Sequence, residues 1–307
     1  MKNRLTAALV CALVCVTALC GCSQTSESSG SASRPTSAAT PDSPEPTDST
    51  VETTGGKIHI TDNVLGDIWI TELEGVAKNE IDPQNLTADD TFKYYSENGK
   101  PASLEGIDIS SFSGDIDWKK VKAAGVDFVM VRVGGRGYGE SGGLYADERA
   151  VEYIKGAQAV GIKAGGYFFS QAINNAEAIE EADYAHEILG DTKLDFPLAF
   201  DWEIIGDETA RTDAVTSTQA TECAVAFCER VKELGYKPMV YSAPREFYFK
   251  YDMTRLADYG IWLVEYAYEP TFYYEFSMWQ YSETGTVDGI DTNVDLNICF
   301  CSVADYD

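Results

Sequence analysis

Eight strand-like runs recur over the last two thirds of this chain, and they constrain its fold more than any other feature. Most of them are almost continuously apolar, which is typical of strands buried on both faces. The runs are residues 106–110, 128–134, 164–169, 197–201, 238–242, 261–266, 277–281 and 294–300.

Helical segments separate the first five runs. Asn174 with Glu177, and Thr216 with Gln219, form predicted capping boxes, and glycines end the segments. The predicted helices are residues 117–124, 144–160, 174–190 and 216–235, with a shorter helix within 244–258. The connections after the sixth run are too short for crossover helices. We therefore predict an α/β fold, a distorted TIM-like (β/α)5(β)3 barrel, for residues 104–307.

The N-terminus has the form of an export signal. Lys2 and Arg4 precede an apolar run, 5–19, that is too short to span a membrane. The run ends in Leu-Cys-Gly-Cys at Cys22, which resembles a bacterial lipobox. The resemblance implies that residues 1–21 are a lipoprotein signal peptide and that a lipid on Cys22 holds the protein at the outer face of the cytoplasmic membrane. The alternative is an ordinary cleaved signal and a secreted protein.

Two segments separate this signal from the predicted barrel. Residues 22–56 are rich in Ser, Thr, Pro and Glu and have almost no large apolar side chain, so we expect a disordered tether. Residues 57–103 are too few for a comfortable core of their own. Their isoleucines alternate around a polar turn, which predicts a hairpin, and we expect the segment to pack on the barrel as an extension. The alternating positions are Ile58, Ile60, Ile68 and Ile70.

Composition excludes several classes of function. The net charge is −27, and removal of residues 1–21 takes away two basic residues and no acid, which leaves −29. Such a polyanion does not suit nucleic acid or anionic membrane surfaces, so we expect a lipid anchor to be its sole link to a membrane. His59 and His186 are the only histidines, and the eight cysteines show no zinc or haem spacing. Any chemistry therefore falls mostly to carboxylates, with no metal or cofactor implied.

The strongest candidate chemistry lies at the end of the fourth run, in Asp201 and Glu203. Side chains of a strand alternate, so both acids point to one side, with Cα atoms roughly 6.6–6.8 Å apart. Retaining glycosidases separate their two carboxyl groups by about 5–5.5 Å and inverting ones by about 6.5–9.5 Å. The pair therefore suits glycoside hydrolysis, although its spacing leaves the stereochemistry open. The alternative is a solvated strand end without chemistry.

Other polar and aromatic side chains fall at or near the ends of the predicted strands, where β/α barrels carry their reactive groups. Aromatic rings can stack on sugars, while carboxylates and amides bind sugar hydroxyls. About half of the aromatic residues are instead expected to fill the core. The candidate substrate-binding residues are Arg132, Tyr167, Tyr241, Trp262, Glu265, Trp279 and Gln280.

An ordered series of motifs covers residues 104–303. The motifs are Gly106-Ile107-Asp108-Ile109-Ser110, Arg132-Val133-Gly134, Gly165-Gly166-Tyr167-Phe168-Phe169-Ser170, Asp201-Trp202-Glu203, Trp279-Gln280-Tyr281-Ser282 and Val294-Asp295-Leu296-Asn297. In content and in order, the series resembles the lysozymes of glycoside hydrolase family 25. Any one motif is weak evidence, whereas their order is specific.

The resemblance implies hydrolysis of the β-1,4 bond between N-acetylmuramic acid and N-acetylglucosamine in peptidoglycan glycan strands. It makes Glu203 the general acid and Asp201 the residue that stabilises the charged intermediate. Asp108 and Asp295 complete an acidic cluster, and such crowding raises the pKa of an acid towards the working pH. Tyr167 and Tyr241 would lie near the substrate's acetamide. A glycosyl-enzyme on Asp201 and attack by that acetamide remain alternative routes.

Departures from the family pattern occur at Ser113, Phe168 and Glu265, and they bear on substrate preference rather than on the four acids. Two other functions compete. The motif around Asp201 also resembles a family 18 chitinase, but Ala199 stands where that motif has an aspartate. A catalytically dead, wall-binding lipoprotein is the alternative outside the enzymes, and the intact acidic cluster argues against it.

Overall fold

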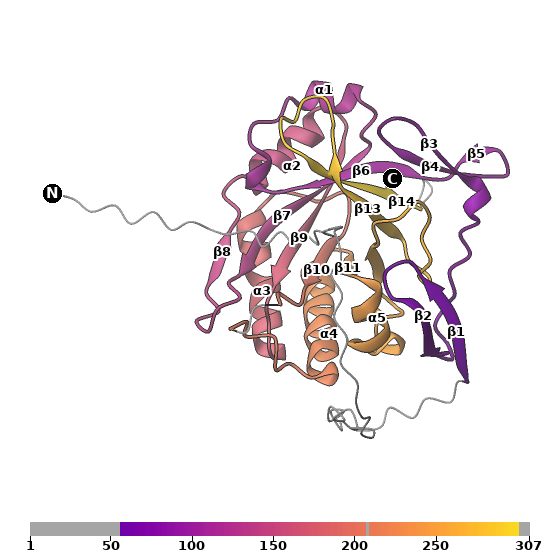
Figure 1. Cartoon of the computed structure of the whole chain (residues 1–307). Coiled ribbons are helices and arrows are strands. Elements are labelled where there is room, and N and C mark those ends of the chain that lie inside the picture. Colours follow the sequence, from indigo (N-terminus) through magenta and orange to yellow (C-terminus); the bar gives the residue numbers. More distant parts are fainter. Residues whose placement is uncertain (1–55, 207–208, 301–307) are drawn as a thin grey trace, which may run out of the picture. The chain divides into compact units, whose positions relative to one another are not determined.

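A computed structural model describes residues 56–206 and 209–300 (Figure 1). Eight strands close into a barrel in which β6 pairs with β7, and β14 alone runs antiparallel to both of its neighbours. In order around the barrel they are β6 (Leu104–Ile109), β14 (Val294–Cys299), β13 (Met278–Gly285), β12 (Gly260–Val264), β11 (Pro238–Ser242), β10 (Leu198–Trp202), β9 (Lys163–Ser170) and β7 (Phe128–Arg136). The predicted distorted barrel is confirmed.

Helices follow the first five barrel strands of the described chain, and none follows β12 or β13. They are α1 (Trp118–Ala123), α2 (Ala150–Ala159), α3 (Asn175–Leu189), α4 (Ser217–Glu233) and α5 (Pro244–Phe249), with short 3-10 turns at Pro83–Asn85, Ser111–Ser113 and Met253–Arg255. Figure 1 shows α3 and α4 side by side on the outside of the barrel. Asp117 caps α1 through the backbone N–H groups of its first turn, and Thr216 with Gln219 forms the expected capping box of α4.

One predicted helix, residues 144–160, is wrong in its first part. Leu144–Ala146 forms strand β8, which pairs antiparallel with the end of β7, and α2 begins only at Ala150. Glycines at the end of β7 permit this pairing, because a Cβ atom on Gly134 would lie 2.6 Å from the carbonyl oxygen of Tyr145. Tertiary pairing therefore overrides the helical pattern of the local sequence.

Strand alternation divides the core into two parts. Inward-facing side chains fill the barrel, and outward-facing ones pack under the helices together with Cys223 and Cys228 of α4, which are buried free thiols. The barrel interior is formed mainly by Leu104, Phe128, Met130, Phe196, Ala199, Met239, Trp262, Met278 and Cys299. A side chain at Gly106 would collide with the ring of Phe128, so this glycine makes room for the interior.

Residues 57–103 form two small sheets. Strand β1 (Lys57–Asp62) pairs with β2 (Gly66–Thr71) so that Ile58 faces Ile70 and Ile60 faces Ile68. The second sheet consists of β3 (Leu86–Ala88), β4 (Lys93–Glu97) and β5 (Lys100–Pro101). Backbone hydrogen bonds join this extension to the loop between β12 and β13, from Asn79 N–H to the Tyr273 carbonyl at 3.0 Å and from Glu275 N–H to the Ala77 carbonyl at 2.9 Å.

The predicted signal peptide, Cys22 and almost all of the tether lie outside the described residues. Within the part of the chain that the structure describes, no helix has the length and apolar character needed to cross a membrane.

Candidate active site

The four predicted acids come from three barrel strands and from the residue just past one of them. Asp108 of β6 and Asp295 of β14 are direct cross-strand neighbours. Asp201 lies on the inward face of β10, and Glu203 follows the end of that strand on the same side. Electrostatic interactions link Asp201, Glu203 and Asp295 to Asp108. The barrel therefore brings the four carboxyl groups into one acidic cluster.

Asp108 is held by side-chain donors. It is buried, and its Oδ2 accepts hydrogen bonds from Gln280 Nε2 at 2.8 Å and from Asn297 Nδ2 at 2.7 Å. Asn297 in turn accepts a hydrogen bond from Trp262 Nε1 at 2.8 Å. Buried charge is tolerated when hydrogen-bond donors surround it, so this network fixes the Asp108 carboxylate in place.

Gln280 extends the network to two tyrosines. Its Oε1 accepts hydrogen bonds from Tyr241 Oη at 2.9 Å and from Tyr266 Oη at 3.2 Å. The rings of Tyr241 and Tyr167 pack edge-on against Trp262, with centroids 4.7 and 5.9 Å from it. These aromatic residues form the floor beneath the acidic cluster.

Asp108 and Asp295 form the first acid pair. Burial and the charge of Asp108 raise the pKa of Asp295 to about 9. Burial also raises the pKa of Asp108, but hydrogen bonds from Asn297, Gln280 and Asp295 oppose that shift. At neutral pH, Asp295 is therefore protonated.

Asp201 and Glu203 form the second acid pair. Asp201 is 5% exposed and its Oδ1 has no hydrogen-bond partner; burial, and then the charge of Glu203, raise its pKa well above the ordinary value. Glu203 is reached by solvent, yet the protein around its carboxyl group removes enough water to raise its pKa, against a hydrogen bond with Asp201 that lowers it. The two carboxyl groups therefore form a hydrogen-bonded pair in which each raises or lowers the pKa of the other.

Arg132 lies on the wall of the site rather than among the acids. Its guanidinium binds Asp147 through Nε at 3.0 Å and Nη2 at 2.9 Å. It also lies 5.0 Å from the ring centroid of Phe112 and 6.0 Å from that of Tyr145. Its positive charge favours ionised Asp201, although burial of that acid has the larger effect.

Comparison with known proteins decides the family. The sequence matches the model described as glycosyl hydrolases family 25 over residues 107–290, more than half of the chain. The chain belongs to this family. The match includes Asp108, Asp201 and Glu203, whereas Asp295 lies just beyond it.

Curated relatives of this family 25 chain include two lysozymes. The chain is 26% identical to the autolytic lysozyme of Clostridium acetobutylicum over 195 residues, which cover 63% of this chain and 55% of that protein. It is 26% identical to lysozyme M1 of Streptomyces globisporus over 206 residues, which cover 64% and 67% of the two proteins. The chain thus spans just over half the length of the first of these relatives.

Solved structures show the same fold. The bacterial lysozyme from Streptomyces coelicolor superposes with a TM-score of 0.55 at 24% identity, over 66% of this chain and 94% of that one. The modular autolysin LytC from Streptococcus pneumoniae gives a TM-score of 0.56 at 23% identity, over 81% of this chain and 57% of that one. At this level of identity the likeness concerns the fold alone.

Two sequence-predicted residues of this family 25 barrel are not brought to the acidic cluster. Trp279 faces outward from β13, is fully buried and donates its Nε1–H to the Glu265 carbonyl at 2.7 Å. The Glu265 carboxylate is also buried, and it accepts hydrogen bonds from Asn63 Nδ2 at 2.8 Å and from Thr271 Oγ1 at 2.7 Å. Both residues hold the loop after β12 instead of facing the acids.

Two residues of the site were missed as candidates. Asn297 binds Asp108 directly, and strand alternation from Asp295 would have indicated it, because both residues lie on the inward face of β14. Tyr266 reaches Gln280, and the one-residue step from Glu265 places it on the opposite side of the chain. In both cases the periodicity of a strand was the available signal.

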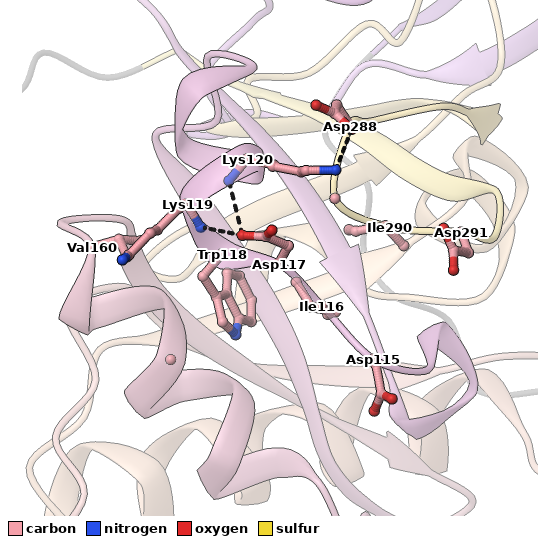
Figure 2. A pocket seen from close by; sticks show the side chains of 12 residues that line it. Asp115, Ile116, Asp117, Trp118, Lys119, Lys120, Val160, Asp288, Ile290 and Asp291 are labelled. Carbon is pink, nitrogen blue, oxygen red and sulfur yellow. Dashed lines mark hydrogen bonds and ion pairs between the residues drawn. The ribbon is translucent and has the colours of Figure 1, made fainter.

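A cavity of about 740 Å³ lies outside the acidic cluster, between α1 and the loop before β14 (Figure 2). Several of its charged groups already have partners. Asp117 accepts hydrogen bonds from the backbone N–H groups of Lys119 and Lys120, and Lys120 Nζ lies 3.6 Å from Asp288. None of the four acids lines this cavity, so we do not assign catalysis to it.

Replacement of Asn297 by alanine is expected to destabilise the barrel by about 2–4 kcal/mol, because it removes one donor from buried Asp108 and leaves Trp262 Nε1 unpaired. Urea unfolding followed by tryptophan fluorescence measures the change. Asn175→Ala is the matched control, since Asn175 is exposed, and it should stay within about 0.5 kcal/mol of the parent. A loss below about 1 kcal/mol for Asn297→Ala would contradict the network.

Proposed function

We propose that this protein is an N-acetylmuramidase that cleaves the β-1,4 bond between N-acetylmuramic acid and N-acetylglucosamine in peptidoglycan. The observation that carries the proposal is the acidic cluster, in which Asp201 and Glu203 form a hydrogen-bonded pair at the end of β10 in a family 25 barrel. The lysozyme names of both curated relatives support the substrate class.

In the proposed reaction, Glu203 donates its proton to the glycosidic oxygen while the bond from that oxygen to the anomeric carbon breaks. The electron pair leaves with the oxygen, and positive charge develops on the sugar ring. Asp201, fixed and buried, stabilises that charge as an anion. The positive charge that grows on the sugar favours the ionised form of Asp201. The proton between Asp201 and Glu203 is therefore drawn towards Glu203 as the reaction proceeds.

The other site residues bind and orient the sugar in this proposal. Asp108, with Asp295 and Gln280, offers hydrogen-bonding groups to sugar hydroxyls, and we assign the Tyr167 and Tyr241 hydroxyls to positioning the acetamide. Burial keeps the pKa of both tyrosines well above 10, so both remain hydrogen-bond donors at neutral pH. Subsequent attack by Asp201 or by the acetamide itself fits the same arrangement.

We further propose that the mature chain begins at Cys22 and is a lipoprotein. The lipobox-like motif supports a lipid on that residue, and the Ser/Thr/Pro-rich segment up to residue 56 supports a tether to the catalytic barrel. The enzyme would then act on peptidoglycan from the outer face of the cytoplasmic membrane. To test the anchor, the parent and Cys22→Ser chains are labelled metabolically with a fatty acid, and their electrophoretic mobilities are compared.

The test of the activity is digestion of purified peptidoglycan by the full-length chain in mild detergent, followed by borohydride reduction and mass analysis. We expect new reducing ends on muramic acid. Reducing ends on glucosamine would instead indicate a glucosaminidase on the same barrel. Binding without cleavage would reject the enzyme in favour of a wall-binding lipoprotein.

A further inference from the structure

The loop after β12 exposes two aromatic rings beside the acidic cluster. Tyr266 is 49% exposed and Tyr268 is 74% exposed. Tyr266 Oη donates to Gln280 Oε1, and Gln280 in turn donates to Asp108, so the loop begins at the cluster itself. Tyr268 lies two residues farther along the same loop.

Asn63, in the turn between β1 and β2, holds this loop. Its backbone N–H donates to Thr271 Oγ1, and its Nδ2 donates to both Glu265 Oε1 and the Glu269 carbonyl, each at 2.8 Å. Glu265 accepts a further hydrogen bond from Thr271 N–H at 3.0 Å. The extension thus fixes the loop that carries the exposed tyrosines.

Lys93 of β4 fixes Tyr268 directly. Its Nζ donates to the Tyr268 carbonyl at 2.8 Å and lies 4.5 Å from the Tyr268 ring centroid. The same ammonium lies 5.6 Å from the Trp279 ring and 5.4 Å from the Tyr281 ring, so it is itself held by aromatic side chains. Although its backbone and ring are both contacted, Tyr268 stays largely exposed.

We propose that Tyr268, positioned by Asn63 and Lys93, is the stacking platform of a pyranose-binding subsite beside the acidic cluster. The inference rests on the proposed function, and its occupant is a sugar ring of the same glycan strand. Continuity with the cluster through Tyr266 supports that occupant. The electron-rich face of a tyrosine attracts the C–H groups of a pyranose, and a ring fixed in advance loses little entropy on binding.

Asn63 and Lys93 lie outside residues 107–290, over which the family model matches. The subsite is therefore a property of this chain's extension together with the barrel. In this proposal Glu265 and Trp279 are positioning residues. Glu265 fixes the loop through its hydrogen bond with Asn63, and the Trp279 ring lies under the ammonium of Lys93.

Binding without turnover tests the subsite. The full-length Glu203→Gln chain is sedimented with purified peptidoglycan, and the Kd is compared after adding Tyr268→Ala, Tyr268→Phe or Asn63→Ala. We expect Tyr268→Ala to raise the Kd about tenfold, Tyr268→Phe to change it less than about twofold, and Asn63→Ala to raise it several-fold. In the catalytically intact chain, Tyr268→Ala should raise KM with little change in kcat, because a remote contact binds substrate and transition state equally.

Trp69→Ala is the matched control. Trp69 is another exposed aromatic residue of the extension, at 62%, and it contacts His59 rather than the loop. An unchanged Kd for Tyr268→Ala, an equal loss for Trp69→Ala, or no binding to peptidoglycan at all would overturn the subsite. Failure of the parent chain to release muramic acid ends would reject the proposed function, while the sedimentation result would still decide whether Tyr268 binds glycan.

Discussion

Glu203→Gln is expected to lower kcat/KM on purified peptidoglycan by about 10²–10⁴-fold, because glutamine has no proton to give to the glycosidic oxygen. The fold should be unaffected, since the Glu203 side chain is exposed beyond the end of β10. We therefore expect the melting temperature to stay within about 2 °C of the parent. Release of reducing ends and calorimetry measure the two quantities.

Glu246→Gln is the matched control for that variant. Glu246 lies close enough for its charge to raise the pKa of Glu203, but it is not a member of the acidic cluster. Its loss should leave kcat/KM within a few-fold of the parent. Substantial turnover by Glu203→Gln, or an equal loss in both variants, would contradict the assignment of Glu203 as the acid.

Asp201→Asn is expected to lower activity by at least about 10²-fold and, in the opposite direction, to stabilise the protein. The activity falls because the neutral amide stabilises positive charge poorly. The stability rises because burial raises the pKa of Asp201, so the parent must take up a proton on folding, a cost that asparagine does not carry. At pH 8 we expect the melting temperature of the variant to lie about 2–4 °C above that of the parent, the shift that about 1 kcal/mol produces in a domain of this size.

The sign of the pH dependence follows from the raised pKa of Asp201. The folded protein keeps a proton on Asp201 at pH values where the unfolded chain, with a pKa of about 3.9, has lost it. Stability contributed by this group therefore falls as pH rises above about 4, until the folded pKa is reached. The asparagine side chain of the variant does not titrate, so the gain of the variant over the parent should grow as pH rises above about 4. A gain that shrinks with rising pH would contradict a buried, proton-binding Asp201.

Strand periodicity was enough to predict most of the site. Asp108, Arg132, Tyr167, Asp201 and Gln280 lie on inward faces at the strand ends, as alternation requires. The same rule should have excluded Trp279, because adjacent residues of one strand cannot both face the barrel interior. Local sequence also misled at residues 144–146, where two glycines of β7 admit a strand in place of a predicted helical turn.

By itself, the sequence determined the barrel and the acidic chemistry at the ends of its strands. Apolar runs, capping boxes and paired acids are local patterns that can be recognised over a few neighbouring residues. Only the tertiary structure decided which residues from distant parts of the sequence form hydrogen bonds with these acids. Asp108 is held by Asn297 from 189 positions away, and this hydrogen bond lowers the pKa of Asp108 against the effect of burial. Glu265 is held away from the acidic cluster by a hydrogen bond from Asn63, which lies 202 positions earlier in the sequence. A buried carboxylate is stable only where hydrogen-bond donors satisfy it.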